Sequence, residues 1–386
     1  MNFGIFRLHH GNIAGTFAMR RMVTLVAATG LATVVSGYTV KPVFNRQAPA
    51  LEVTLAPIAT GEVAELVATI KNVGSTDLNL LKVGTLLDDV LPVQKVLATD
   101  EAGVEAPFRG IHASIRYDAL TTAHFQPLKV SESVRAIIKT ASVHEFTKSG
   151  IYTFSATGLL PVAPAGSSIL SGPAISIQSN KISLHIDSQA AEAVPMALGA
   201  NPLEARTNVQ DGCNATQLAA STAALGNCET LALAAATDAT DPSSARFVEY
   251  FRTNSSTTRQ IVADRLTAAA KECSTTNAGP SRYFCYDYYG ICESEGPLNA
   301  YTKWDFDFVI MCPLFYDTLP PLPQGCHRQC QATTTIHEFT HCEDVYSPHT
   351  NDFTYGYNES VALPPEHALL NADTYSLYAN AVYMKC

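Results

Sequence analysis

The cysteines constrain this chain more than any other feature, because all ten lie in its second half. The first 212 residues contain none, and the rest of the chain carries Cys213, Cys228, Cys273, Cys285, Cys292, Cys312, Cys326, Cys330, Cys342 and Cys386. An even, dense set of cysteines is typical of disulfide-bonded domains made in an oxidising compartment. The paired Cys-x-x-Cys knuckles of a cytosolic zinc ribbon do not occur. The pattern therefore predicts a secreted, extracellular chain whose second half is held by disulfides.

The amino-terminal residues agree with secretion. Residues 19–22 (Met-Arg-Arg-Met) are basic, and residues 23–37 form a weakly apolar stretch that ends in small side chains. This pattern predicts a signal peptide region over residues 1–37, in which residues 1–18 are either a long amino-terminal region of the signal peptide or an upstream extension from a start that is not used. An uncleaved membrane anchor over residues 19–37 is the weaker alternative, because the stretch is short and polar for a membrane span.

Charge and texture change near residue 206. Residues 207–386 hold 9 basic and 20 acidic residues, a formal net charge of −11, whereas the first 206 residues hold 16 and 15, a net charge of +1. Residues 188–206 carry two prolines and many alanines, and they end in Arg206, which suits a processing protease. An ordinary interdomain tether is the alternative. The change predicts two folding units that meet near residue 206.

The first unit has the pattern of β-strands. Apolar and polar residues alternate over residues 51–55, 66–70, 111–115 and 151–155, and glycine, proline and Asn/Asp clusters separate them. Short strands at such spacing predict a β-sandwich of immunoglobulin-like type. The histidines of this unit are scattered, at His112, His124, His144 and His185, and a lone histidine on a strand is usually structural. No catalytic constellation is expected there.

The second unit is predicted to be mainly α-helical, with an α+β character. Helical spacing of apolar residues or a high alanine and leucine content marks residues 218–236, 245–273, 332–343 and 366–383. Between the second and third of these ranges, residues 279–323 are rich in aromatic and turn-forming residues.

One of these predicted helices carries a His-Glu-x-x-His motif, His337-Glu338-Phe339-Thr340-His341. Residues four apart lie on one face of a helix, so the two histidines can bind one metal ion, and neutral imidazole is a good zinc ligand. Glu338 would then lie near the water-occupied position and accept a proton from the water. The alternative is a structural role, with Thr335 as helix N-cap and Glu338 completing a capping box.

A catalytic zinc needs a third protein ligand. The metzincin pattern does not fit, because its glycine and histidine positions hold Asp344 and Ser347. A glutamate from a following helix is another route, for which Glu359 and Glu366 are the candidates.

Residues 337–357 (HEFTHCEDVYSPHTNDFTYGY) and 369–386 (LLNADTYSLYANAVYMKC) resemble the carboxy-terminal part of the deuterolysins, secreted fungal zinc proteases also called aspzincins. Their third ligand is the aspartate of a Gly-Thr-x-Asp-x-x-Tyr-Gly motif, and residues 349–356 read His-Thr-Asn-Asp-Phe-Thr-Tyr-Gly. The resemblance implies a zincin-like fold and one Zn²⁺ per chain. It assigns His337, His341 and Asp352 as ligands, Glu338 as general base and Tyr355 as a stabiliser of the tetrahedral intermediate.

Two nearby residues remain open. His349 stands where the motif has its first glycine, and it could compete as a ligand. Asp373 is a second acidic position that the family pattern shares, for which we expect a structural role such as bonding a ligand histidine.

The resemblance also implies a preproprotein, with a β-rich propeptide over residues 38–206 and a catalytic domain over residues 207–386. The family's processing site usually ends in Lys-Arg, whereas this chain has Ala205-Arg206. The family pattern pairs Cys213 with Cys285, Cys292 with Cys312, Cys326 with Cys386 and, as a plausible fourth, Cys228 with Cys273. Cys330 and Cys342 are left over. On one helix they would stand about 18 Å apart, too far for a disulfide, so they are free or the pairing differs from the family's.

These observations predict a secreted zinc metalloendopeptidase, made as a zymogen and monomeric, that cleaves proteins or peptides. The acidic mature unit predicts a preference for basic substrates, which the family resemblance also implies; the alternative is that the acidity only keeps a secreted protein soluble. The overall charge of −10 disfavours nucleic acid. No stable membrane association is expected. The alternative is a non-catalytic secreted zinc- or ligand-binding protein rich in disulfides. The predicted propeptide has no cysteine, so it cannot block the zinc with a thiolate. A histidine or carboxylate of the propeptide could occupy the open metal position instead, and the sequence does not indicate which one.

Overall fold

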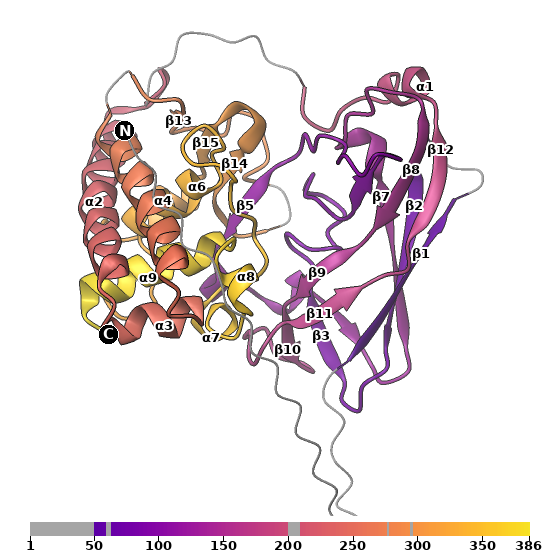
Figure 1. The fold of residues 1–386 in the computed structure, drawn as a ribbon, viewed down its shortest axis with the longest axis horizontal. Coiled ribbons are helices and arrows are strands. Elements are labelled where there is room, and N and C mark those ends of the chain that lie inside the picture. The colour runs from indigo at the N-terminus through magenta and orange to yellow at the C-terminus, as the bar shows by residue number, and fades with distance from the viewer. Residues whose placement is uncertain (1–49, 59–62, 200–208, 276–277, 294–295) are drawn as a thin grey trace, which may run out of the picture. The chain divides into compact units, whose positions relative to one another are not determined.

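The computed structural model describes residues 50–58, 63–199, 209–275, 278–293 and 296–386 (Figure 1). The predicted signal peptide region and the predicted processing site at Arg206 lie outside these residues. The chain contains mixed strands and helices, with most strands in the amino-terminal part and most helices in the carboxy-terminal part. No described helix has the length and apolar character that a membrane crossing needs.

The amino-terminal part contains small antiparallel sheets, in agreement with the predicted β-rich character. Their strand orders are β1-β2-β7, β10-β3-β6, β12-β8-β4 and β11-β9. The strands are β1 (Leu51–Pro57), β2 (Glu65–Asn72), β3 (Leu78–Leu81), β4 (Leu97–Thr99), β6 (Phe125–Leu128), β7 (Ser133–Lys139), β8 (Gly150–Ser155), β9 (Thr157–Leu160), β10 (Val162–Pro164), β11 (Ile175–Gln178) and β12 (Ile182–Ile186). Alternate residues of β1, Val53 and Leu55, are buried in a common core.

Short helices interrupt this part and lead out of it. They are the 3₁₀ turns Tyr117–Ala119, Thr122–His124 and Thr140–Ser142, and helix α1 (Ser188–Glu192). A further 3₁₀ turn, Trp304–Phe306, lies in the carboxy-terminal part.

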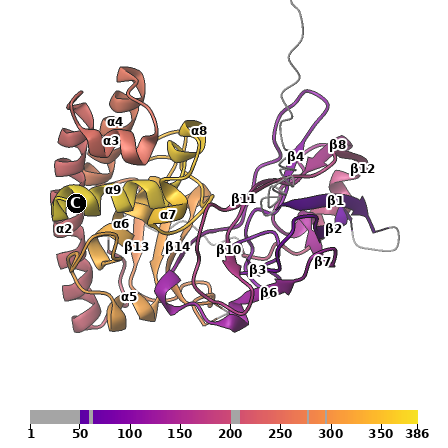
Figure 2. The ribbon, with the colours of Figure 1, turned by 90° about the horizontal axis from the view of Figure 1, so that it is seen from below.

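The carboxy-terminal helices pack together around a second core. Helix α2 contacts α4, α6 and α9 (Figures 1 and 2). The helices are α2 (Ala215–Thr240), α3 (Ala245–Phe251), α4 (Ser256–Ser274), α5 (Pro313–Thr318), α6 (Gln331–Thr340), α7 (Tyr357–Ser360), α8 (Pro365–Ala368) and α9 (Ala372–Met384). Asn214 starts α2 with a capping box, because its side chain accepts from the backbone N–H of Gln217.

The prediction of a single helix over residues 245–273 is wrong, because this segment forms two helices, α3 and α4. Arg252 ends α3 in a left-handed conformation, with φ of 55°. Ser255 then starts α4 by accepting from the N–H of Thr258. Thr253, Asn254 and Ser255 favour caps and turns over helix interiors, which explains the break.

Four disulfides tie the carboxy-terminal part together. They join Cys213–Cys285, Cys228–Cys273, Cys292–Cys312 and Cys326–Cys386, the same pairs that the family resemblance implies. Cys330 and Cys342 are buried and free.

A fifth sheet among the described residues has the strand order β13-β15-β14-β5. Its strands are β13 (Arg282–Phe284), β14 (Leu298–Lys303), β15 (Phe308–Met311) and β5 (His112–Ile115). Strand β5 pairs antiparallel with β14, so an amino-terminal segment lies at the edge of a carboxy-terminal sheet (Figure 1). The expectation that residues 111–115 belong to the amino-terminal sandwich is therefore wrong. Alternation in a sequence shows which residues share a face, but it does not identify the partner strand.

The described residues belong to one compact unit. One core, around β5, is built from both parts of the chain. There Ile111, Ala113 and Ile115 are buried in the same cluster as Leu298 and Tyr301.

Candidate metal centre

Helix α6 carries both histidines of the motif and is buried along its whole length. It begins after Cys330, whose sulfur accepts from the N–H of Thr333 at 3.4 Å. Thr335 is fully buried inside the helix, and its hydroxyl donates to the carbonyl of Gln331. The alternative in which Thr335 caps the helix is therefore wrong. His341 is the C-cap but keeps right-handed helical geometry, which preserves the helical spacing from His337.

The side chains of His337, His341 and Asp352 converge on one point. Asp352 Oδ1 lies 3.1 Å from His337 Nε2 and 3.3 Å from His341 Nε2. In a tetrahedral zinc site with bonds of about 2.0–2.1 Å, neighbouring ligand atoms stand about 3.3 Å apart. The two separations from Asp352 Oδ1 match this value.

These three atoms and Glu338 Oε1 are buried, and none has a hydrogen-bond partner among the described residues, although Asp352 Oδ1 forms ion pairs with both Nε2 atoms. Because buried polar atoms are almost always hydrogen-bonded, three potential ligand atoms so close together, with Glu338 Oε1 unpaired beside them, need a physical reason. Two imidazole nitrogens and a carboxylate oxygen are a donor set for Zn²⁺, so the residues fit a metal ion.

A hydrogen bond orients His341, and a nearby carboxylate lies behind His337. The carbonyl of Thr350 accepts from His341 Nδ1 at 2.9 Å, which leaves the Nε2 lone pair free for a metal. Asp373 Oδ1 lies 3.6 Å from His337 Nδ1, and Oδ2 of the same carboxylate accepts from the N–H of Gly356 at 2.6 Å. Asp373 therefore lies beside a candidate ligand and supports it from the far side of the ring.

Asp352 is held ionised. Burial acts to raise the pKa of its carboxyl, but the positive charges of His341 and His337 hold that pKa well below its usual value. A carboxylate that is ionised while buried suits a site where positive charge gathers.

Glu338 lies next to the ligands and is completely buried. Its Oε2 accepts from the Thr302 hydroxyl at 2.7 Å, while Oε1 is unpaired. Burial raises the pKa of Glu338 to about 7, and the charges of His337 and His341 oppose the rise. A pKa near neutrality suits a group that accepts and then returns a proton.

Tyr355 is buried in the same site. Its hydroxyl donates to the carbonyl of Ala113 at 2.7 Å, and its ring stacks 6.4 Å from that of His337. Burial raises the pKa of Tyr355 well above its usual value, so the hydroxyl remains a donor.

The rival ligands lie apart from the convergent atoms. Nδ1 of His349 lies 2.7 Å from Glu343 Oε2, and its ring stacks on Trp304 at 4.5 Å. Among the described residues, the potential ligand atoms within 4.8 Å of one another belong to His112, His341 and Asp352. His337 is not in that group either, but its Nε2 lies 3.1 Å from Asp352 Oδ1, whereas no such contact with Asp352 is found for His349, Glu359 or Glu366.

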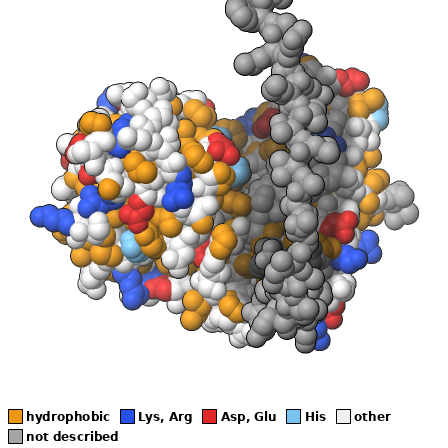
Figure 3. All heavy atoms as spheres, turned by 60° about the horizontal axis from the view of Figure 1, so that its bottom comes forward, with side chains coloured by type: hydrophobic (Ala, Val, Ile, Leu, Met, Phe, Trp, Pro, Cys, Tyr) orange, Lys and Arg blue, Asp and Glu red, His pale blue; other side chains and the backbone are white. Residues whose placement is uncertain are grey.

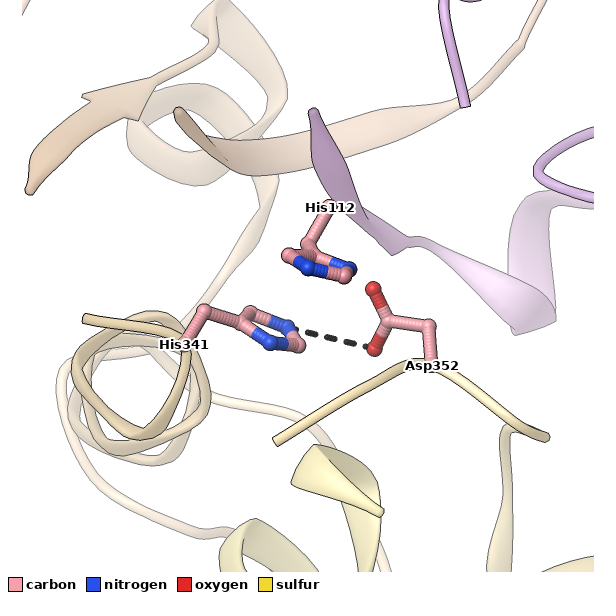
Figure 4. Close-up of side chains that lie close together, drawn as sticks. All are labelled: His112, His341 and Asp352. Carbon is pink, nitrogen blue, oxygen red and sulfur yellow. Dashed lines mark ion pairs between the residues drawn. The ribbon is translucent and has the colours of Figure 1, made fainter. Parts of the chain in front are cut away.

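His112 is the residue that the sequence did not reveal. Its imidazole stacks on that of His341, with centroids 4.5 Å apart, and Figure 4 shows the Asp352 carboxylate beside both rings. His112 Nε2 is buried and unpaired, and burial lowers the pKa of the ring well below its usual value. No local pattern marks this histidine, because its position depends on the pairing of β5 with β14.

Comparison with known proteins identifies the family. Residues 20–386 match the family described as Deuterolysin metalloprotease (M35). The chain belongs to this family. A neutral protease 2 homolog of Botryotinia fuckeliana is 42% identical over 368 residues, which cover 95% of this chain and 100% of the relative. A homolog of Sclerotinia sclerotiorum is 44% identical over 336 residues, which cover 87% of this chain and 91% of the relative.

These matches confirm the resemblance that the sequence showed. The deuterolysins are metalloproteases, so the chain belongs to a metalloprotease family. In this deuterolysin the candidate ligands come from α6 and from the loop after it, and β5 contributes the additional imidazole of His112.

Proposed function

We propose that the protein is a secreted zinc endopeptidase that holds one Zn²⁺ through His337, His341 and Asp352. The observation that carries the proposal is the convergence of three buried ligand atoms, with Asp352 Oδ1 3.1 and 3.3 Å from the two Nε2 atoms, and the unpaired Glu338 Oε1 in the same site. A structural zinc site has no need of such a glutamate, whereas peptide hydrolysis has.

Bound zinc supplies a Lewis acid that activates water and polarises the scissile carbonyl. Glu338 Oε1 accepts a proton from the attacking water and delivers it to the leaving amine nitrogen as the C–N bond breaks. The Thr302 hydroxyl holds the other carboxylate oxygen at 2.7 Å, which fixes the orientation of the base.

Tyr355 stabilises the negative charge that develops on the carbonyl oxygen. Its hydroxyl already donates to a peptide carbonyl, that of Ala113, at 2.7 Å. A donor held in a buried site interacts more strongly with a developing oxyanion than the same donor in water.

The substrates are proteins or peptides, preferably basic ones. Residues 207–386 carry a formal net charge of −11, from 9 basic and 20 acidic residues, and such a charge concentrates cationic partners. On the face drawn in Figure 3, acidic side chains are dispersed among basic and hydrophobic ones. The preference would therefore act through the long-range field more than through one acidic patch on that face.

The enzyme is made as a monomeric preproprotein. Residues 1–37 direct secretion, and cleavage after Arg206 separates the propeptide 38–206 from the catalytic domain 207–386. Four disulfides suit an oxidising, extracellular compartment.

The test is to express the full precursor in a secretory host and to assay the purified, processed product on casein. Activity should disappear in Glu338→Ala and in the presence of a zinc chelator, and it should return when zinc is restored. A folded, processed and zinc-loaded product without turnover on casein or a basic protein would favour a non-catalytic zinc-binding protein.

A further inference from the structure

The edge strand of the sheet beside the candidate metal centre belongs to the segment that processing would remove. Residues of β5 pair antiparallel with β14, with Ala113 opposite Tyr301 and His112 opposite Thr302. Adding a strand to a sheet edge is a common way to bind an extended peptide. Strand β5 therefore occupies this edge as a bound peptide would.

The register places His112 beside the catalytic apparatus. Thr302, its partner on β14, donates to the proposed base Glu338. The His112 side chain is only 6% exposed, and its Nε2 has no hydrogen-bond partner among the described residues. A ligand atom of His112 lies within 4.8 Å of ligand atoms of His341 and Asp352 (Figure 4).

The backbone next to His112 binds two further groups of the site. The N–H of Ala113 donates to Asp352 Oδ2 at 3.1 Å, and its carbonyl accepts from the Tyr355 hydroxyl at 2.7 Å. The backbone of β5 thus accepts the hydrogen bond of Tyr355, the proposed oxyanion donor. It also donates to Asp352 Oδ2, whereas the two histidines lie beside Oδ1 of the same carboxylate.

Contacts on both sides of the strand fix its position. Gln329 donates to the carbonyl of Ile115 at 2.9 Å, and the N–H of Arg116 donates to the carbonyl of Pro297 at 2.7 Å. Ile111 and Ile115 are buried in the core that both parts of the chain build. The imidazole is therefore held on an ordered, anchored strand.

We propose that His112 is a fourth protein ligand of the zinc in the uncleaved precursor, and that it keeps the precursor inactive by closing the open metal position. The proposal rests on the proposed function. A catalytic zinc has three protein ligands and one open position, whereas four protein ligands make a closed, structural site. Removal of the propeptide takes away the imidazole and strand β5 together.

The experiment uses the full precursor with Arg206→Ala to prevent processing, and mass spectrometry verifies that the chain is intact. Zinc X-ray absorption counts the imidazoles at the metal. We expect three in this precursor, two when His112→Gln is added and two in the processed enzyme. His185→Gln is the matched control, because His185 is an exposed histidine of strand β12 in the same segment, and it should leave three.

A second readout is the affinity of each intact precursor for zinc, measured by competition with a chromogenic chelator. Loss of a group behind a ligand typically weakens metal binding by about 10–100-fold, so loss of the imidazole itself should weaken zinc binding by at least about tenfold in His112→Gln and not in His185→Gln. His112→Ala, which removes the side chain amide as well, should give the same results.

Two imidazoles in the parent precursor, or equal zinc affinities in parent and His112→Gln, would overturn the proposal even if the processed enzyme is active. Three imidazoles in the precursor, together with a zinc-loaded processed enzyme that cleaves nothing, would instead overturn the proposed function and leave His112 as a ligand. Circular dichroism and thermal unfolding of each variant show whether it is folded.

Discussion

Helix α6 and strand β5 both bring imidazoles to the candidate metal centre, but they do so by different physical means. His337 and His341 face the same point because they are four residues apart on one helix. His112 reaches that point only because β5 pairs with β14, and the adjacent Ala113 lies 239 residues from Asp352 along the chain. Local geometry can be recognised in a sequence, whereas long-range strand pairing cannot.

The two elements also differ in what they can do. Helix α6 contributes two candidate ligands and Glu338, the proposed base, so it should be indispensable to turnover. Strand β5 contributes an imidazole and two backbone contacts, all of which should oppose turnover. Substitutions on either side can break this contrast or sharpen it.

The largest effect is expected at Glu338. Glu338→Gln keeps the shape of the side chain and its bond from Thr302 but removes the proton acceptor, so kcat/KM of the processed enzyme should fall by about 10³-fold. Zinc content should remain at one per chain. Glu366→Gln, at an exposed glutamate in α8, is the control and should retain activity. If the Glu338→Gln enzyme were fully active, Glu338 would not be the general base, and α6 would contribute only candidate metal ligands.

Tyr355 should have the next largest effect. Tyr355→Phe removes a buried donor, and loss of one oxyanion donor typically costs about 10²-fold in kcat, with little change in KM. Steady-state kinetics on a fluorogenic peptide measures both constants. Tyr357→Phe is the control, because the Tyr357 hydroxyl bonds Glu249 instead of the site. Equal kinetics for Tyr355→Phe and the parent would assign Tyr355 only to holding Ala113 of β5.

The residues that the sequence proposes for the site lie close together in the structure, whereas parts of the fold around them were predicted wrongly. The family motif pointed to Asp352, and the structure places its Oδ1 3.1 Å from His337 Nε2. The position of β5 was missed, because the alternation in residues 111–115 fits any sheet with one buried face. The break between α3 and α4 was missed as well, since the apolar spacing continues across Arg252 while its left-handed backbone ends the helix.

A smaller effect is expected at Asp373, which lies 3.6 Å from His337 Nδ1. Asp373→Asn should weaken zinc binding by about 10–100-fold, because the carboxylates behind metal-binding histidines strengthen and orient them. Competition with a chelator measures this change. Ser376→Ala removes only a hydroxyl that donates to the same carboxylate, at 3.1 Å, and should weaken binding less. If the two variants lose equal affinity, Asp373 acts mainly through local packing.

The smallest effect is expected at His349, whose ring also lies beside His112, with centroids 5.4 Å apart. Its Nδ1 is engaged with Glu343, and its ring stacks on Trp304, so it should not bind the metal. His349→Ala should therefore change the zinc affinity of the processed enzyme by less than about threefold, whereas His341→Ala should abolish tight binding.

His349→Ala and His341→Ala together test whether a histidine close to the candidate centre is also a metal ligand. The rings of His349 and His112 lie close to each other, but of these two residues only His112 has a ligand atom within 4.8 Å of those of His341 and Asp352. If His349→Ala loses as much zinc as His341→Ala, His349 is a ligand despite its bond to Glu343. Retention of zinc would show that the histidine in place of the motif's glycine leaves the metal centre of this deuterolysin intact. The histidine at position 349 would then affect only the wall of the site, where its ring packs on Trp304.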